Sequence, residues 1–125
     1  MLGHSMNNAK WVRLFTHLAG LMDTSIVVLT KLVWDEQPRS MWIRDKYQDA
    51  QFESDFYCTS VEAMIGGYPR GWYSYKEIEW IDFAGSSEMI VVLKAQIESI
   101  GRFDLEIIGA ALRLFAYRRI SRSQQ

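Results

Sequence analysis

The sequence predicts an α+β domain with a largely antiparallel sheet and two main helices packed on one face. Apolar residues recur at helical spacing in two separated segments, and short stretches rich in β-branched and aromatic residues lie between and after them. The chain has 125 residues, 49% of them hydrophobic. Two domains of about 60 residues each would have marginal cores. We therefore expect one domain over residues 1–125, with residues 1–6 and 120–125 frayed.

The first predicted element is a helix from Asn8 to Leu21. Its apolar residues recur every three or four positions, at Trp11, Leu14, Leu18 and Leu21. Asn7 or Asn8 is suited to cap the start by accepting backbone N–H bonds.

Several strands should follow this helix. Residues 25–34 are rich in Ile, Val, Leu and Thr, which favours a strand, and the apolar run 26–29 predicts burial on both faces. Residues 35–40 predict a turn, 41–46 a partner strand and 52–59 another strand. Val61 to Ile65 fits either one helical turn after a capping box at Thr59 or a continued strand.

The second half contains a central strand, a helix and a final strand. Gly66-Gly67 breaks the chain, residues 68–71 suit a turn, and Glu77 to Phe83 is the expected central strand. The second helix follows a hydroxyl cap at Ser86 or Ser87 and ends at Gly101, a natural left-handed cap. Asp104 is expected to cap a short turn through Ile108, and residues 112–118 form a strand. The predicted shared core is Trp11, Leu14, Leu18, Trp80, Ile90, Leu93 and Ile97.

Composition excludes several classes of protein. A net charge of −1 does not suit a dedicated nucleic-acid binder, and one cysteine cannot form an internal disulfide. The longest aliphatic runs are far shorter than the roughly 18 residues that a membrane span needs. The first residues lack the features of a secretory leader. We expect a cytoplasmic protein.

Residues with catalytic potential are scarce. His17 has no second histidine at ligand spacing, and Cys58 has no nearby cysteine or basic cluster, so both are expected to be structural. Glu77 and Glu79 share one side of a predicted strand, which could pair their carboxylates, but no neighbouring residue specifies a reaction. We therefore expect no catalytic residue, no metal and no cofactor.

Aromatic residues and charge are unevenly distributed. Five aromatic residues lie close together beside Arg70, and they either brace a loop against the sheet or form an exposed platform for a partner. They are Tyr68, Trp72, Tyr73, Tyr75 and Trp80. From Asp35 to Glu62 seven acidic residues oppose three basic ones, whereas Arg113, Arg118, Arg119 and Arg122 make the C-terminal end basic. Such segregation can steer binding to a charged partner.

Four short motifs carry a resemblance to a family of small bacterial proteins. They are Asn7-Asn8-Ala9-Lys10-Trp11, Gly66-Gly67-Tyr68, the strand Ile78-Glu79-Trp80-Ile81-Asp82-Phe83, and Tyr117-Arg118-Arg119. The family looks like the compact immunity-type proteins that accompany bacterial toxins. The resemblance implies a non-enzymatic protein that binds and neutralises a cognate toxin, and it transfers no catalytic residue.

The expected partner site combines acidic and aromatic residues. The acidic group is Asp45, Asp49, Glu53 and Asp55 beside Tyr47, and the aromatic loop is Tyr68, Arg70, Trp72 and Tyr73. Acidic residues would attract a basic toxin, and aromatic side chains would anchor it. The alternative function is a small nucleic-acid-associated regulator that uses the basic C-terminal end. The oligomeric state stays open.

Overall fold

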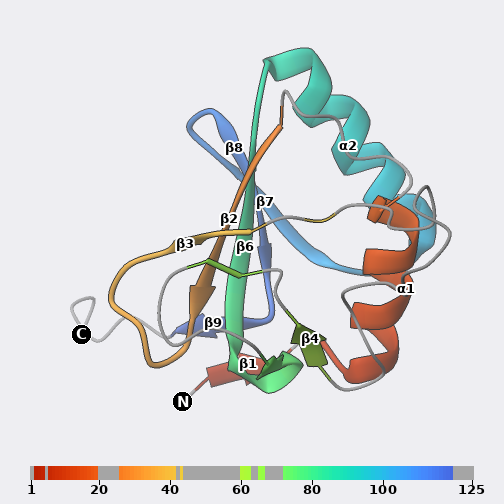
Figure 1. Cartoon of the computed structure of the whole chain (residues 1–125). Helices are drawn as coiled ribbons and strands as arrows, with labels where there is room; N and C mark the ends of the chain where they lie inside the picture. Colours follow the sequence, from red (N-terminus) through yellow and green to blue (C-terminus); the bar gives the residue numbers. More distant parts are fainter. Residues whose placement is uncertain are drawn as a thin grey trace, which may run out of the picture.

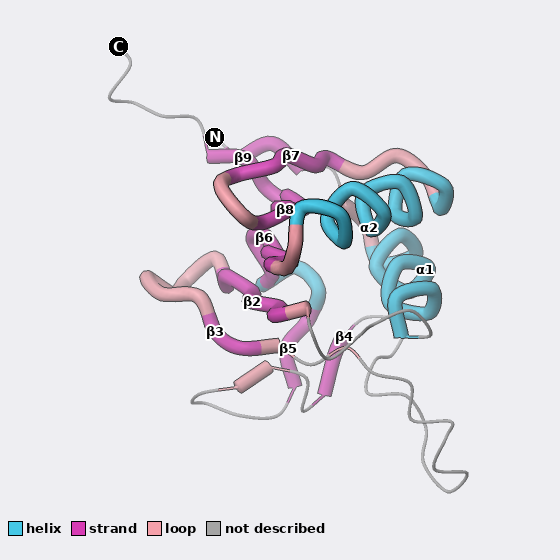
Figure 2. The backbone as a smooth tube through the Cα atoms, turned by 90° about the horizontal axis from the view of Figure 1, so that it is seen from above, coloured by secondary structure: helices cyan, strands magenta, loops and turns pink. Residues whose placement is uncertain are grey.

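The computed structural model describes residues 2–4, 6–19, 26–41, 43, 60–62, 65–66 and 72–119. Its main feature is a five-stranded antiparallel sheet with strand order β3-β2-β6-β8-β7. Both described helices lie on one face of this sheet (Figures 1 and 2). The predicted α+β class is therefore confirmed.

The strands of the main sheet have these bounds: β2 Val27–Leu32, β3 Arg39–Ser40, β6 Ile78–Ala84, β7 Asp104–Ile108 and β8 Ala111–Phe115. β6 is central, as the sequence predicts. β7 and β8 form a hairpin whose turn is Gly109-Ala110. Two smaller sheets pair β1 (Leu2–His4) with β9 (Tyr117–Arg119), and β4 (Ser60–Glu62) with β5 (Trp72–Ser74).

Helix α1 (Asn8–Ala19) begins where the sequence predicts. The Asn7 side chain accepts a hydrogen bond of 2.9 Å from the backbone N–H of Lys10, which identifies Asn7 as the cap. Helix α2 (Ser87–Ile100) is capped by Ser86, which accepts from the backbone N–H of Met89. Among the described residues, neither helix is long and apolar enough to cross a membrane.

The core lies between the sheet and the two helices. Six of the seven predicted core residues are buried there: Trp11, Leu14, Leu18, Ile90, Leu93 and Ile97. Trp11 also stacks on Tyr75, with ring centroids 5.8 Å apart. Trp80, the seventh, is only half-buried, so its assignment to the core is wrong.

A β-bulge explains the error at Trp80. Lys31 pairs with Trp80 and Leu32 pairs with Ile78, which leaves Glu79 as an extra residue. The extra residue breaks the alternation, so Ile78 and Ile81 are both fully buried while Trp80 is not. Regular alternation along the strand would instead place Ile78 and Trp80 on the same face.

Other local predictions also differ from the structure. Val27 is 58% exposed and burial alternates along β2, so this strand is covered on one face only. Residues 104–108 form an edge strand instead of a capped turn. Gly101 has φ 167°, which is extended backbone and not a left-handed cap. Residues 2–4, expected to be frayed, pair with β9.

The structure decides between the two interpretations of residues 61–65, whereas two other predictions for the middle of the chain lie outside the described residues. Ser60–Glu62 is a strand, and Ile65 bridges to Met41, which favours the strand interpretation of this segment. The partner strand of β2 is Arg39–Ser40, slightly earlier than predicted. The strand predicted over 52–59 and the turn predicted over 68–71 lie outside the described residues.

Candidate functional site

The face of the main sheet opposite the helices is the candidate functional site, and we call it the open face. Residues directly opposite one another in an antiparallel sheet share a face, so the strand register arranges its side chains in three rows. The apolar row is Val27, Ala84, Ala111 and Ile108. The charged row is Leu29, Asp82, Arg113 and Glu106. The aromatic row is Lys31, Trp80, Phe115 and Asp104.

The apolar row is open to solvent. Val27 at one end is 58% exposed and Ile108 at the other is 37% exposed. Ala84 and Ala111 lie between them and are partly exposed. Their side chains are shorter than the branched side chains of Val27 and Ile108 at the two ends of the row. The row thus places two exposed branched side chains at its ends and two small apolar side chains between them.

The charged row is internally paired. Arg113 donates from Nε and Nη2 to the two carboxylate oxygens of Asp82, at 2.7 and 2.9 Å. The hydrogen bond to Asp82 raises the pKa of Arg113, and the nearby charge of Glu106 acts in the same direction. Bidentate pairs of this kind fix the orientation of both side chains.

The aromatic row is interleaved with arginines. The guanidinium carbon of Arg113 lies 3.7 Å from the ring centroid of Trp80 and 6.0 Å from that of Phe115. Arg118, which follows β8 in the chain, lies 4.0 Å from the ring centroid of Phe115. Trp80, Arg113, Phe115 and Arg118 thus form a ladder of cation–π contacts across the open face.

Arg118 is held by β7 as well as by the ladder. It donates to both carboxylate oxygens of Asp104, at 2.6 and 2.9 Å, and its Nη1 lies 3.0 Å from a carboxylate oxygen of Glu106. The hydrogen bond to Asp104 raises the pKa of Arg118 above its ordinary value. Each arginine of the ladder therefore faces carboxylates, so the ladder does not present free positive charge.

The two candidate carboxylates of the sequence analysis do not pair with each other. Glu77 ends the short 3₁₀ turn η2 (Tyr75–Glu77); it accepts from the Trp34 indole N–H at 3.0 Å and from the backbone N–H of Ser74. Glu79 is the bulge residue, is buried, and lies 3.4 Å from the Lys31 ammonium. Each carboxylate thus has its own separate contacts, and the pairing that their spacing would allow does not occur.

Tyr73 belongs to the interior and not to an exposed aromatic platform. It is only 3% exposed, and its hydroxyl accepts from Arg39 Nη1 at 2.9 Å. Trp34 and Tyr73 stack on each other with ring centroids 6.3 Å apart, and the Arg39 guanidinium carbon lies 5.1 and 5.8 Å from those two centroids. Arg39 also bonds Asp35 at 2.6 Å. Burial lowers the pKa of Arg39, but the hydrogen bond to Asp35 and the contacts with Tyr73 outweigh it and raise the pKa overall. This part of the aromatic segment braces β5 against the loop that follows β2.

Most of the other predicted partner-binding residues lie outside the described part of the chain. These are Asp45, Tyr47, Asp49, Glu53, Asp55, Tyr68 and Arg70. Trp72 lies in β5 opposite Glu62, and only its backbone is described. Cys58 is also outside the described residues.

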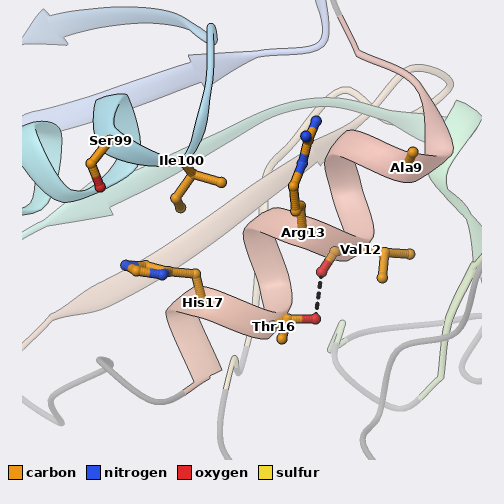
Figure 3. Close-up of a pocket in the computed structure, with 7 residues that line it drawn as sticks. All are labelled: Ala9, Val12, Arg13, Thr16, His17, Ser99 and Ile100. Carbon is orange, nitrogen blue, oxygen red and sulfur yellow. Dashed lines mark hydrogen bonds between the residues drawn. The ribbon is translucent and has the colours of Figure 1, made fainter.

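A shallow groove of about 890 Å³ lies between α1 and the end of α2. In Figure 3, His17 points toward that end of α2, where Ser99 and Ile100 lie, whereas Val12 points away from it. Thr16 bonds the Val12 carbonyl of its own helix at 2.7 Å, and His17 Nε2 lies 3.4 Å from Gln96 Oε1. His17 thus contacts α2 through Gln96, and the lining side chains do not converge on one point.

Among the described residues, no group of three or more His, Cys, Asp or Glu side chains could hold a metal ion. No protein-family model, curated protein or solved structure matches this chain.

The apolar row of the open face was not predicted from the sequence. Its four members come from four different strands, so no motif or spacing along the chain connects them. The register of four strands is what brings the row together.

Proposed function

We propose that this chain is a non-enzymatic protein-binding module of the immunity type, which neutralises a protein partner by docking it on the open face. The observation that carries the proposal is the solvent-open apolar row beside the paired ladder. An interface needs an apolar centre, bordered by aromatic and arginine side chains that are already held in position. On the open face the apolar row lies next to the row that contains Arg113, and the row that contains Trp80 and Phe115 follows it.

The ordered arginine side chains of the open face also support the binding of a protein partner. Arg113 and Arg118 are fixed by carboxylates and rings before any partner arrives. Side chains that are already ordered lose little conformational entropy on binding, which favours affinity. A rigid sheet face with short side chains in one row can thus accept a complementary surface without rearrangement.

The nucleic-acid alternative has less support. Phosphate binding needs arginines whose charge is available, but Arg113 and Arg118 contact Asp82, Asp104 and Glu106. A phosphate would have to compete with these carboxylates. The protein-binding function is therefore the one we argue for.

The test uses the protein encoded by the neighbouring gene. We expect this protein to inhibit the growth of a bacterial host, and we expect co-expression of the present chain to restore growth. We expect a Kd near 1 nM, about −12 kcal/mol, because an inhibitor must leave almost no free toxin. The purified proteins give the affinity by calorimetry or surface binding.

Two exposed valines provide a matched pair of variants. Val27 on the open face is 58% exposed and Val92 on α2 is 59% exposed. We expect Val27→Glu to raise Kd by about thirtyfold or more, and Val92→Glu to change it by less than about twofold. Equal effects would place the interface away from the open face. Absence of binding and of growth protection, with steeply salt-dependent binding to DNA or RNA, would favour the alternative function.

A further inference from the structure

We propose that the outer edge of β7 pairs with an extended segment of the protein partner, and that this segment alternates basic and aliphatic residues. The inference rests on the proposed function, because it names the part of the partner that the chain recognises. Strand addition to a sheet edge is a common way to bind an extended segment, in which backbone bonds give affinity and side chains give specificity.

The first observation is the position of β7 in the sheet. It is the last strand in the order β3-β2-β6-β8-β7 and pairs only with β8 among the described strands. The hairpin turn has two residues, with Gly109 at φ 60°, so Ile108 and Ala111 flank it. In such a hairpin the flanking residues form a hydrogen-bonded pair and the pattern then alternates. The backbone N–H and C=O groups of Leu105 and Ile107 therefore point away from β8.

The second observation is the apolar surface at this edge. Ile107 is 52% exposed and Ile108 is 37% exposed, and they lie on opposite faces of the same strand. Exposed edge strands are normally protected by charge, proline or a bulge; β7 has charged residues only at Asp104 and Glu106 and has no proline. Ile108 also ends the apolar row, so the edge continues directly from the proposed docking surface.

The third observation is charge, which favours a partner segment over a second copy of this chain paired about Glu106. Symmetric antiparallel pairing of two β7 strands about Glu106 would place this residue opposite Glu106 of the second copy. Like charges directly opposite each other destabilise a strand pair. A lysine or arginine opposite Glu106 would instead be stabilising, because the Glu106 side chain remains 49% exposed beside Arg118.

The side chains of β7 define the pattern of the segment. Asp104 and Glu106 lie on the open face, whereas Leu105 and Ile107 lie on the other face. A segment with basic residues on the first face and aliphatic residues on the second complements both. A nucleic acid or a purely acidic peptide would supply neither the basic side chains nor the aliphatic side chains.

The probe is a capped Lys-Val-Lys-Val-Lys peptide added to the isotope-labelled full chain, and the matched control is Glu-Val-Glu-Val-Glu. By NMR we expect the lysine peptide, and not the glutamate peptide, to shift the Leu105 and Ile107 amide signals. The same peptide should slow the exchange of these amides with solvent about tenfold. Shifts elsewhere, or no shifts, overturn the inference.

Three variants separate backbone pairing from charge. Ile107→Pro removes an outward N–H without removing a bond to β8, so we expect about tenfold weaker peptide binding. Ile107→Thr keeps that N–H and should change the affinity by less than about twofold. Glu106→Lys keeps every backbone donor and should reverse the preference toward the glutamate peptide, so it remains informative if the proline variant does not fold.

The outcomes distinguish this inference from the proposed function. If the toxin-like protein binds and Val27→Glu weakens it, but the peptide leaves Leu105 and Ile107 unaffected, only the edge inference fails. If the peptide pairs with β7 but no protein partner is neutralised, only the proposed function fails. Self-association of the free chain that Ile107→Pro abolishes would identify a second copy as the occupant and overturn the inference.

Discussion

Arg113 stacks on the ring of Trp80, 3.7 Å from its centroid, while the same guanidinium bonds both carboxylate oxygens of Asp82. The three side chains come from β6 and β8, where Asp82 and Arg113 are directly opposite. One cation thus links an aromatic and an acidic residue of the neighbouring strand, so the ladder contributes both to stability and to the shape of the open face.

Removal of Arg113 should destabilise the fold through the carboxylate left behind. The Asp82 side chain is only 13% exposed, so in Arg113→Ala it loses its partner in a partly desolvated position. We expect a cost of about 2–3 kcal/mol in the free energy of unfolding. In a double-mutant cycle with Asp82→Ala, the coupling should be about 1–2 kcal/mol. Additive effects would show that the ion pair contributes little.

Trp80 and Trp11 should respond differently to truncation. Trp11 is buried among Phe15 and Tyr75, so Trp11→Ala should cost about 3–5 kcal/mol in denaturant unfolding. Trp80 is half-buried and loses mainly its contact with Arg113, so Trp80→Ala should cost about 1–2 kcal/mol. Equal costs would place Trp80 in the core after all.

Two glycines form a matched pair for backbone conformation. Gly109 has φ 60°, and a Cβ there would meet nothing within 4 Å, so Gly109→Ala tests conformation alone. We expect a loss of about 1 kcal/mol in thermal or denaturant unfolding. Gly101 is extended, and its Cβ would lie 3.7 Å from the Phe103 ring, so Gly101→Ala should be neutral within about 0.5 kcal/mol. A neutral Gly109→Ala would contradict the assigned turn.

The cap of α1 should depend on Asn7 and not on Asn8. Asn7→Ala removes the acceptor of the Lys10 N–H and should cost about 1 kcal/mol in the free energy of unfolding. Asn8 is already within the helix, where alanine is the better helix former, so Asn8→Ala should be neutral or slightly stabilising. The reverse order would assign the cap to Asn8.

The acidic segment predicted from the sequence should act on the rate of association. In binding to the toxin-like partner, the double variant Asp49→Lys and Asp55→Lys should mainly lower the association rate, because long-range electrostatic attraction guides the encounter of the two proteins. Trp72→Ala should mainly speed dissociation, as expected for an anchor residue. Surface binding at low and high salt measures both rates. Unchanged rates in both variants would exclude these residues from the interface.

Local patterns in the sequence predict the helices and the central strand well. The apolar spacing of Trp11, Leu14 and Leu18 fixes the buried face of α1, and Ser86 caps α2 because a hydroxyl there can accept the free N–H of Met89. Such signals act within a few residues, so they can be read without knowledge of the tertiary structure.

The location of Trp80 depends on the tertiary structure. A bulge at Glu79 shifts the register by one residue, and a one-residue shift moves side chains to the opposite face. Residues 104–108 carry a possible capping aspartate, yet pairing with β8 makes them a strand. Pairing partners far apart in the sequence outweigh local preference because each supplies several hydrogen bonds and contacts.

By itself, the sequence determined the α+β class, the starts of both helices and most of the core, because apolar periodicity and capping are local properties of the chain. Only the tertiary structure determines which residues lie side by side on the open face. Val27, Ala84, Ala111 and Ile108 become neighbours through the register of four strands, and Arg113 and Arg118 are paired with carboxylates brought from β6 and β7. In the sequence Arg113 and Arg118 belong to a basic end of the chain, but the tertiary structure places carboxylates beside both of them.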